Sequence, residues 1–176
     1  MSEAVILETE RLRLTQPEAG DFPAYRRFYS IENDQAGRYR APRREDEAWT
    51  ILAGDIGHWT LRGFGMFVIT RKSDDEVIGG CGLYHPQGWP SHELTWWLLP
   101  SARGNGFATE ASRAVLGFGY DRLGWPQVET HMRDENAPAR RLAERLGGRI
   151  DRREVFPDGV ARDVFHLPHP AKEVAA

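Results

Sequence analysis

The sequence has a single cysteine, Cys81, no apolar run long enough to cross a bilayer, and no strong excess of either charge. One cysteine excludes an internal disulfide framework and fits a reducing compartment, and its apolar neighbours favour a buried thiol over a nucleophile. The N-terminal residues show no basic stretch leading into an apolar segment, so we expect a cytoplasmic protein that does not enter a membrane. A net charge of −3 argues against a general nucleic-acid binder.

Clusters of His, Cys, Asp and Glu at metal-ligand spacing are also missing, so we expect no bound metal. The sequence contains no internal repeat, low-complexity tract or linker rich in proline, glycine and serine. Its 176 residues therefore suit a single domain over residues 1–176, large enough to bury a sizeable core. A homodimer is compatible with this sequence, although no specific feature indicates one.

The most informative segment runs from Leu98 to Ala111, where an apolar strand breaks at Pro100, crosses two glycines and enters a helix. Gly104 and Gly106 allow positive φ and leave no Cβ in the way, so successive N–H groups can converge on an anion. The helix that follows adds unpaired N–H groups and the positive end of its dipole. Arg103 can add a charge-assisted contact, and the segment therefore predicts a phosphate site.

Three glycine motifs share this physics, and two of them do not match. A P-loop needs Lys followed by Ser or Thr after its last glycine, but Phe107 and Ala108 follow Gly106. A dinucleotide fingerprint needs a third small residue where Thr109 stands and an acidic residue ending a second strand. The third pattern, Arg/Gln-x-x-Gly-x-Gly/Ala, is matched in full by Arg103-Gly104-Asn105-Gly106-Phe107-Ala108. This segment resembles the acetyl-CoA pyrophosphate loop of the GNAT N-acetyltransferases.

Hydrophobic periodicity predicts strands at 6–14, 64–71, 76–84, 91–99, 127–132, 150–156 and 160–167. It predicts helices beginning near Asp21 and Glu45, and further helices over 105–123 and 138–146. This is the element order of the GNAT family. The resemblance implies an α+β fold with a mixed, mostly antiparallel seven-stranded sheet that splays at its fourth strand and is flanked by about four helices.

A second motif, residues 136–148, resembles the Asn-x-x-Ser-x-x-Leu-x-x-Lys-Leu-Gly-Phe helix of the same family. The resemblance implies that Asn136 binds the pantetheine arm of acetyl-CoA, and that this arm pairs with the backbone of Trp97, Leu98 and Leu99. Taken alone, Asn136 equally suits a helix N-cap. The first strand and the closing hairpin also resemble the branch with ribosomal-protein N-terminal acetyltransferases, so that the likeness spans about 6–168.

Acyl transfer to a primary amine needs a base, because an amine is almost wholly protonated at pH 7. Glu93 is our first candidate, acting directly or through water, although it also suits an exposed strand carboxylate. His92 and His131 are weaker candidates without a visible partner, and Glu154 is either a pocket residue or a solvated one. The resemblance places an N–H group that stabilises the oxyanion at Leu98.

Two positions depart from the family pattern in a way that concerns the leaving thiolate. Ala139 replaces the motif's serine, and Ala143 stands where a tyrosine is common. A water, Tyr84 or Tyr120 could supply the proton instead, or the thiolate leaves unaided. Two functions therefore stay open: an acetyl-CoA-dependent N-acetyltransferase, or a catalytically weak acyl-CoA-binding module on the same fold.

The acceptor is the least determined part of the function. The enzyme reading allows a small-molecule amine or a protein N-terminus. An arginine cluster could attract an acidic acceptor or the 3′-phosphate of coenzyme A, or be a solvated loop; it comprises Arg38, Arg40, Arg43 and Arg44. Five aromatic residues could line an acceptor pocket or form ordinary core, namely Trp49, Trp59, Trp89, Trp96 and Phe156.

Overall fold

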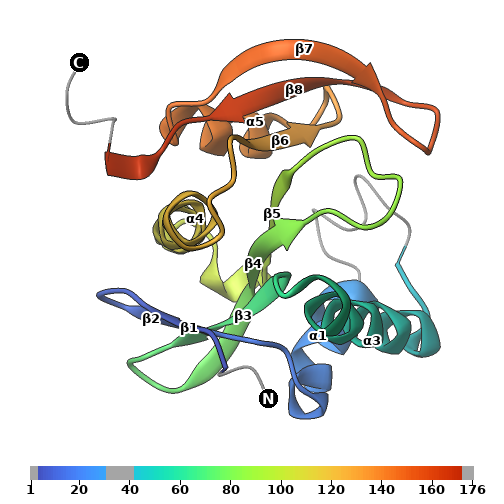
Figure 1. Ribbon diagram of the computed structural model, residues 1–176. Helices are drawn as coiled ribbons and strands as arrows, with labels where there is room; N and C mark the ends of the chain where they lie inside the picture. Colours follow the sequence, from blue (N-terminus) through green and yellow to red (C-terminus); the bar gives the residue numbers. More distant parts are fainter. Residues whose placement is uncertain (1–3, 31–41, 172–176) are drawn as a thin grey trace.

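A single eight-stranded sheet runs through the computed structural model, which describes residues 4–30 and 42–171 (Figure 1). Its strands are β1 (Ile6–Glu8), β2 (Leu12–Thr15), β3 (Met66–Arg71), β4 (Glu76–Tyr84), β5 (Glu93–Leu98), β6 (Val128–Met132), β7 (Arg149–Val155) and β8 (Ala161–Leu167). The spatial order is β1-β2-β3-β4-β5-β6-β8-β7. All neighbours are antiparallel except β5 and β6, which confirms the mixed, mostly antiparallel sheet.

Four α-helices flank this sheet in the described part of the chain. They are α1 (Phe22–Ser30), α3 (Glu45–Arg62), α4 (Phe107–Gly117) and α5 (Ala137–Arg145). Three shorter helical segments adjoin these elements: η1 (Ala19–Asp21) precedes α1, η2 (Pro100–Ala102) follows β5, and the π-helical η3 (Phe118–Arg122) continues α4. None of the helices within residues 4–30 and 42–171 is long and apolar enough to span a membrane.

The strand predicted at 6–14 is wrong in one respect, because it is two strands, β1 and β2. The chain reverses between them, where the Thr9 N–H donates to the Leu12 carbonyl and the Thr9 hydroxyl oxygen accepts from the Leu12 N–H. Leu7 then lies opposite Leu14. Apolar and polar residues alternate through the turn as they do in a strand, so the sequence pattern does not indicate the reversal. The sheet therefore has eight strands instead of the seven predicted.

Helices α1 and α3 pack on one face of the sheet. Tyr25 and Phe28 of α1 and Leu52 of α3 form a cluster there with Trp97 and other strand residues. Within it, the Tyr25 hydroxyl donates to Asp55 Oδ2 at 2.7 Å. Burial raises the pKa of Asp55 to about 6, and burial beside that carboxylate raises the pKa of Tyr25 above its ordinary value.

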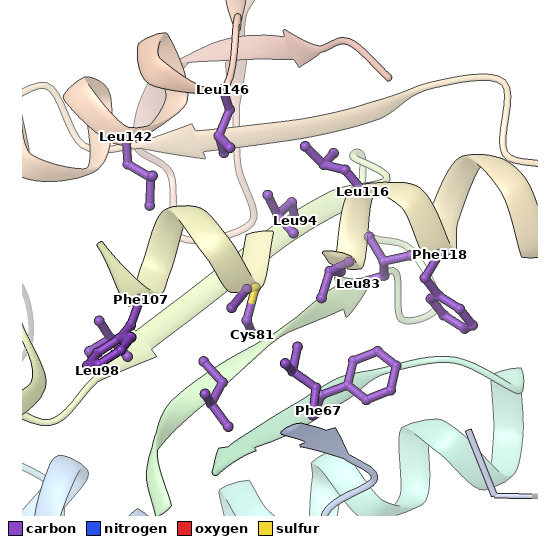
Figure 2. Packing of buried hydrophobic residues seen from close by; sticks show 14 of the residues in the cluster. Phe67, Cys81, Leu83, Leu94, Leu98, Phe107, Leu116, Phe118, Leu142 and Leu146 are labelled. Atoms are coloured by element: carbon purple, nitrogen blue, oxygen red, sulfur yellow. The ribbon is translucent and has the colours of Figure 1, made fainter. Parts of the chain in front are cut away.

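Helices α4 and α5 pack on the opposite face and cover the larger core cluster (Figure 2). Leu83, Leu94 and Leu116 belong to it, as does Cys81, which is fully buried. The expectation of a buried cysteine is confirmed, and burial raises the pKa of the Cys81 thiol to about 12.

Strands β5 and β6 share only one paired position, Glu93 opposite Glu129. The Glu129 N–H donates to the His92 carbonyl at 2.8 Å, and the Thr130 hydroxyl donates to the Leu94 carbonyl at 2.9 Å. Beyond this point the two strands diverge (Figure 1). The sheet therefore splays at the fourth strand of the prediction, which is β5 in the structure.

Candidate active site

The glycine loop connects β5 to α4. Gly104 and Gly106 have φ of 77° and 79°, as the sequence predicts. A Cβ at Gly104 would meet nothing within 4 Å, so the backbone angle and not crowding favours glycine there. The Asn105 side chain donates to the Ala102 and Arg103 carbonyls at 3.3 and 2.9 Å and fixes the turn. Helix α4 begins at Phe107, not at Asn105, so its first N–H groups open onto this loop.

The edge of β5 that faces the opening is defined by backbone hydrogen bonds. The Leu99 N–H donates to the Ile78 carbonyl on the β4 side. Because successive residues of a strand direct their backbone groups to opposite sides, the backbone groups of Leu98 point to the other side, toward the opening. The Leu94 carbonyl has the same direction, since Thr130 of β6 contacts it.

Two side chains predicted to bind the ligand, those of Arg103 and Asn136, have hydrogen-bond partners inside the protein. Arg103 donates from Nε and Nη2 to the Leu98 carbonyl, at 3.3 and 3.2 Å, so its guanidinium lies between the edge of β5 and the glycine loop. Asn136 is the N-cap of α5, and its Oδ1 accepts from the Ala139 N–H at 3.2 Å. Capping uses the amide oxygen and not the amide N–H₂ group.

Glu93 lies where β5 and β6 begin to separate, and it is buried at 8% exposure. Trp89 Nε1 donates to Glu93 Oε2 at 2.8 Å. His131 Nε2 lies 3.1 Å from the same oxygen, and the His131 ring centroid lies 3.8 Å from that of Phe156. His131 therefore faces a carboxylate that its place in the sequence does not reveal. Because Glu93 is buried, the alternative interpretation of it as an exposed strand carboxylate is wrong.

Comparison with known sequences identifies the family. The sequence profile of the acetyltransferase (GNAT) domain matches residues 11–149, most of the chain. The chain belongs to the GNAT acetyltransferase family. It is 26% identical over 143 residues to the uncharacterised N-acetyltransferase YnaD of Bacillus subtilis strain 168, covering 81% of this chain and 82% of that protein. Other relatives are also named N-acetyltransferases, and this chain is therefore an N-acetyltransferase.

Solved structures agree with this assignment. An acetyltransferase from Agrobacterium tumefaciens strain C58 has a TM-score of 0.83 and 28% identity, with 96% of each chain covered. The ribosomal L7/L12 α-N-protein acetyltransferase RimL, in complex with coenzyme A, shares the fold at a TM-score of 0.71 and 15% identity, covering 94% of this chain and 99% of its own. Members of the GNAT family bind acetyl-CoA, and this neighbour holds coenzyme A.

The acetyltransferase contains two charge networks that sequence reasoning missed. In the first, Glu110 of α4 accepts from the Thr9 hydroxyl at 2.6 Å, from the Arg11 N–H at 2.9 Å and from Arg11 Nε at 2.7 Å. Arg11 Nη1 also donates to the Asn105 carbonyl at 2.9 Å. Both segments carry family resemblance in the sequence, but nothing in the spacing of Thr9, Arg11 and Glu110 shows that they meet.

In the second network, Glu129 lies almost fully buried beside Glu93. It accepts hydrogen bonds from the Ser91 hydroxyl at 2.9 Å and from the Arg152 guanidinium. Burial opposes ionisation of Glu129, but these donors outweigh it and its pKa is lowered. Glu154, a sequence candidate for the acceptor pocket, instead accepts from Arg152 Nε at 3.1 Å as part of this network.

The aromatic candidates for an acceptor wall separate into three groups. Trp89 and Phe156 lie around Glu93 and His131, with their ring centroids 5.5 Å apart. Trp59 is buried and Trp96 packs against the core on the α4 side. Trp49 is 59% exposed, so it belongs neither to the core nor to a wall around Glu93.

Several other candidates have structural partners. His92 stacks on His85 with ring centroids 4.2 Å apart. Tyr120 donates to the Leu167 carbonyl and accepts from the Val128 N–H. Arg43 and Arg44 form surface ion pairs with Glu47 and Asp46, whereas Arg38 and Arg40 lie outside the described residues.

The two departures from the family pattern lie on the inner side of α5. Ala143 is fully buried in the core and Ala139 packs against it. No group that can donate a proton therefore stands at either position. Within residues 4–30 and 42–171, no cluster of three or more His, Cys, Asp or Glu side chains is arranged to hold a metal ion.

Proposed function

We propose that this N-acetyltransferase transfers acetyl from acetyl-CoA to a primary amine, of a small molecule or a protein N-terminus, by direct attack without a covalent intermediate. The observation that carries this proposal is the juxtaposition of the open β5 edge with the positive-φ glycine loop. An exposed strand edge binds an extended arm by backbone hydrogen bonds, and a glycine turn before a helix binds phosphates.

The donor would lie along both features. In this proposal its pyrophosphate accepts hydrogen bonds from the loop backbone and contacts Arg103, and its pantetheine arm pairs with the β5 edge and with Asn136. The residues involved are Trp97, Leu98, Leu99, Arg103, Gly104, Asn105, Gly106, Phe107, Ala108 and Asn136. The Arg103 contact with the Leu98 carbonyl supports this arrangement, because it holds a cation at the junction of edge and loop.

The chemistry then requires a proton acceptor and an oxyanion donor. Glu93 is the proposed base, and the Leu98 N–H, directed toward the opening, is the proposed donor to the oxyanion. Residues of a strand rise by about 3.3 Å each, so these two lie roughly 16 Å apart along β5. Glu93 must therefore act through an intermediary such as water.

Direct attack is supported by the state of Cys81. It is the one cysteine in the sequence, it is fully buried, and burial raises the pKa of its thiol to about 12. A thiol of that kind is not a nucleophile for acetyl transfer. Incubation with acetyl-CoA alone is therefore expected to give no acetylated protein by mass spectrometry.

The test of the proposal is coenzyme A thiol release against a panel of amines and peptides with free or blocked N-termini. We expect release with at least one free amine, and a fall in kcat with an altered pH profile for Glu93→Gln. Tight acetyl-CoA binding with no release across the panel would instead support the acyl-CoA-binding module. An unchanged pH profile for Glu93→Gln would remove Glu93 from the mechanism.

A further inference from the structure

The pairing of Glu93 with His131 bears on how Glu93 acts at a distance. His131 stands two residues beyond Glu129 on β6, and Glu129 is opposite Glu93. In register, His131 is therefore level with Thr95, about 7 Å further toward the open part of β5 than Glu93. The imidazole thus lies on the side of Glu93 from which the acceptor amine would be reached.

The two ring nitrogens of His131 are buried in an energetically unfavourable environment. Its side chain is 9% exposed, and neither ring nitrogen forms an aligned hydrogen bond within the described residues, although Nε2 lies 3.1 Å from Glu93 Oε2. Burying ring nitrogens without aligned partners is unfavourable, because each loses its hydrogen bonds to water. If residue 131 only packed between Trp89 and Phe156, a phenylalanine there would pack as well as the histidine. A buried imidazole beside a buried carboxylate, with its hydrogen-bonding groups unsatisfied, therefore calls for an explanation other than packing.

Other charges near His131 are already compensated. Glu129, on the same face of β6, is paired with Arg152 of β7. Arg162 of β8 lies over the Phe156 ring and is paired with Asp158. Glu93 is therefore the charge that faces the imidazole without another ionic partner in the described part of the chain.

We propose that His131 accepts the proton of the acceptor ammonium and that Glu93 acts through it as a positioning residue. This inference rests on the proposed function and assigns to His131 the proton-accepting role that the proposed function gave to Glu93. A neutral His131 turns Nε2–H toward Glu93, and Nδ1 takes a proton from R–NH₃⁺ through a bound water. The product is R–NH₂ and an imidazolium that the Glu93 carboxylate stabilises.

The remaining protons and bonds balance without another reactant. The amine nitrogen forms the new C–N bond and the C–S bond breaks. The second nitrogen proton passes to the thiolate sulfur, which leaves as the coenzyme A thiol. The proton held on His131 is then released to solvent, which accounts for the one proton that the overall reaction sets free.

The test compares His131→Phe, Glu93→Gln, the double variant and the matched control His92→Phe. His92 is adjacent to Glu93 in sequence but stacks on His85, away from the pair. We expect His131→Phe to lower kcat at least tenfold, to leave the KM for acetyl-CoA unchanged and to abolish the acidic limb of the pH profile. The double variant should be no slower than His131→Phe, because Glu93 acts only through His131, and the control should match the wild type.

A second readout is independent of the acceptor. The ring-nitrogen resonances of His131 are compared by NMR in the wild type and in Glu93→Gln, where we expect the Nε2 resonance to shift because the charged carboxylate no longer faces it. A wild-type pH profile for His131→Phe together with an impaired Glu93→Gln would overturn the His131 role and leave the proposed function standing. Unimpaired activity in both variants would overturn the His131 role and remove Glu93 from the mechanism, while acetyl transfer itself would stand.

Discussion

Glu110 in the first turn of α4 binds Arg11, which lies 99 residues earlier in the chain, with 2.7 Å between Oε2 and Nε. The same carboxylate holds the Thr9 hydroxyl, so one side chain fixes the turn between β1 and β2. Arg11 in turn donates to the Asn105 carbonyl. The N-terminal turn is thus attached to the glycine loop that we propose for the pyrophosphate.

The first prediction concerns this attachment. Glu110→Gln removes the ionic contact with Arg11, and we expect a loss of about 1–2 kcal/mol in the free energy of unfolding at pH 7, together with a higher KM for acetyl-CoA. Glu8→Gln, which alters exposed ion pairs with Arg13 and Lys72, is the control and should change neither. Denaturant titration and donor kinetics measure the two effects.

The pH dependence of that loss follows from the charge of Glu110. Burial opposes its ionisation, but hydrogen bonds from Thr9 and Arg11 outweigh burial and lower its pKa in the folded state. The stabilisation is therefore present above the unfolded pKa of Glu110 and is lost as the pH falls through the folded value. A difference between wild type and Glu110→Gln that stays constant down to acidic pH would contradict this account.

The second prediction concerns Asp55, whose effect on stability changes with pH in the opposite direction to that of Glu110, because burial raises the pKa of Asp55 to about 6. The folded state then holds that proton more tightly than the unfolded state, and stability falls by on the order of 3 kcal/mol as the pH rises from about 4 to above 6. Asp55→Asn keeps an acceptor for the Tyr25 hydroxyl and removes the buried charge. It should be more stable than the wild type at pH 8 and equal to it near pH 4.

The control for Asp55 is Tyr25→Phe, which leaves the carboxylate without the hydroxyl that donates to it. It should destabilise the enzyme by about 1–3 kcal/mol at pH 8. Urea denaturation at pH 4, 6 and 8 measures both variants. Equal stability of Asp55→Asn and wild type at every pH would show that the buried charge carries no cost.

The third prediction uses the backbone of the glycine loop. Alanine at Gly106, where φ is 79°, should cost about 1–2 kcal/mol or shift the loop, and it should raise the KM for acetyl-CoA several-fold with a smaller effect on kcat. Gly54→Ala is the matched control, because Gly54 lies in α3 with nothing within 4 Å of a Cβ. It should add about 0.5–1 kcal/mol of stability and leave KM unchanged.

The fourth prediction separates the two contacts available to Arg103. Arg103→Gln should raise the KM for acetyl-CoA about tenfold and have little effect on S-acetyl-pantetheine, which lacks the pyrophosphate. Steady-state kinetics with both donors measures this. An equal loss with the two donors would mean that Arg103 acts through the Leu98 carbonyl and not on the phosphates.

Local patterns predicted much of the fold. The glycines at 104 and 106 adopt the positive φ that their place before a helix requires, and the segment 76–84 is a strand as its apolar residues indicate. That strand contains three glycines, which usually weaken a strand. They are required here because the neighbouring strands approach too closely to leave room for a Cβ. A Cβ at Gly79 would lie 2.3 Å from the Trp97 carbonyl oxygen. That reason is visible only once β4 and β5 are paired.

Contacts between distant residues were not predictable in the same way. The pairs Arg11 with Glu110 and Glu93 with His131 join elements far apart in the sequence, and each depends on how the sheet and α4 pack. His131 stands alone in the sequence because the carboxylate that it faces lies on another strand. The split of 6–14 into β1 and β2 has a related cause, since Glu110 of α4, about 100 residues later in the chain, helps to hold the turn.

The single paired position between β5 and β6 makes cohesion of the sheet depend on other elements. One side of the seam holds β1 to β5 and the other holds β6, β8 and β7, and α4 packs against β4 and β5 while also contacting α5. An acetyl-CoA arm hydrogen-bonded along β5 would supply backbone pairing that β6 does not. The donor would then act as a temporary strand of the sheet, and amide exchange along the edge of β5 would slow in proportion to how fully it is bound.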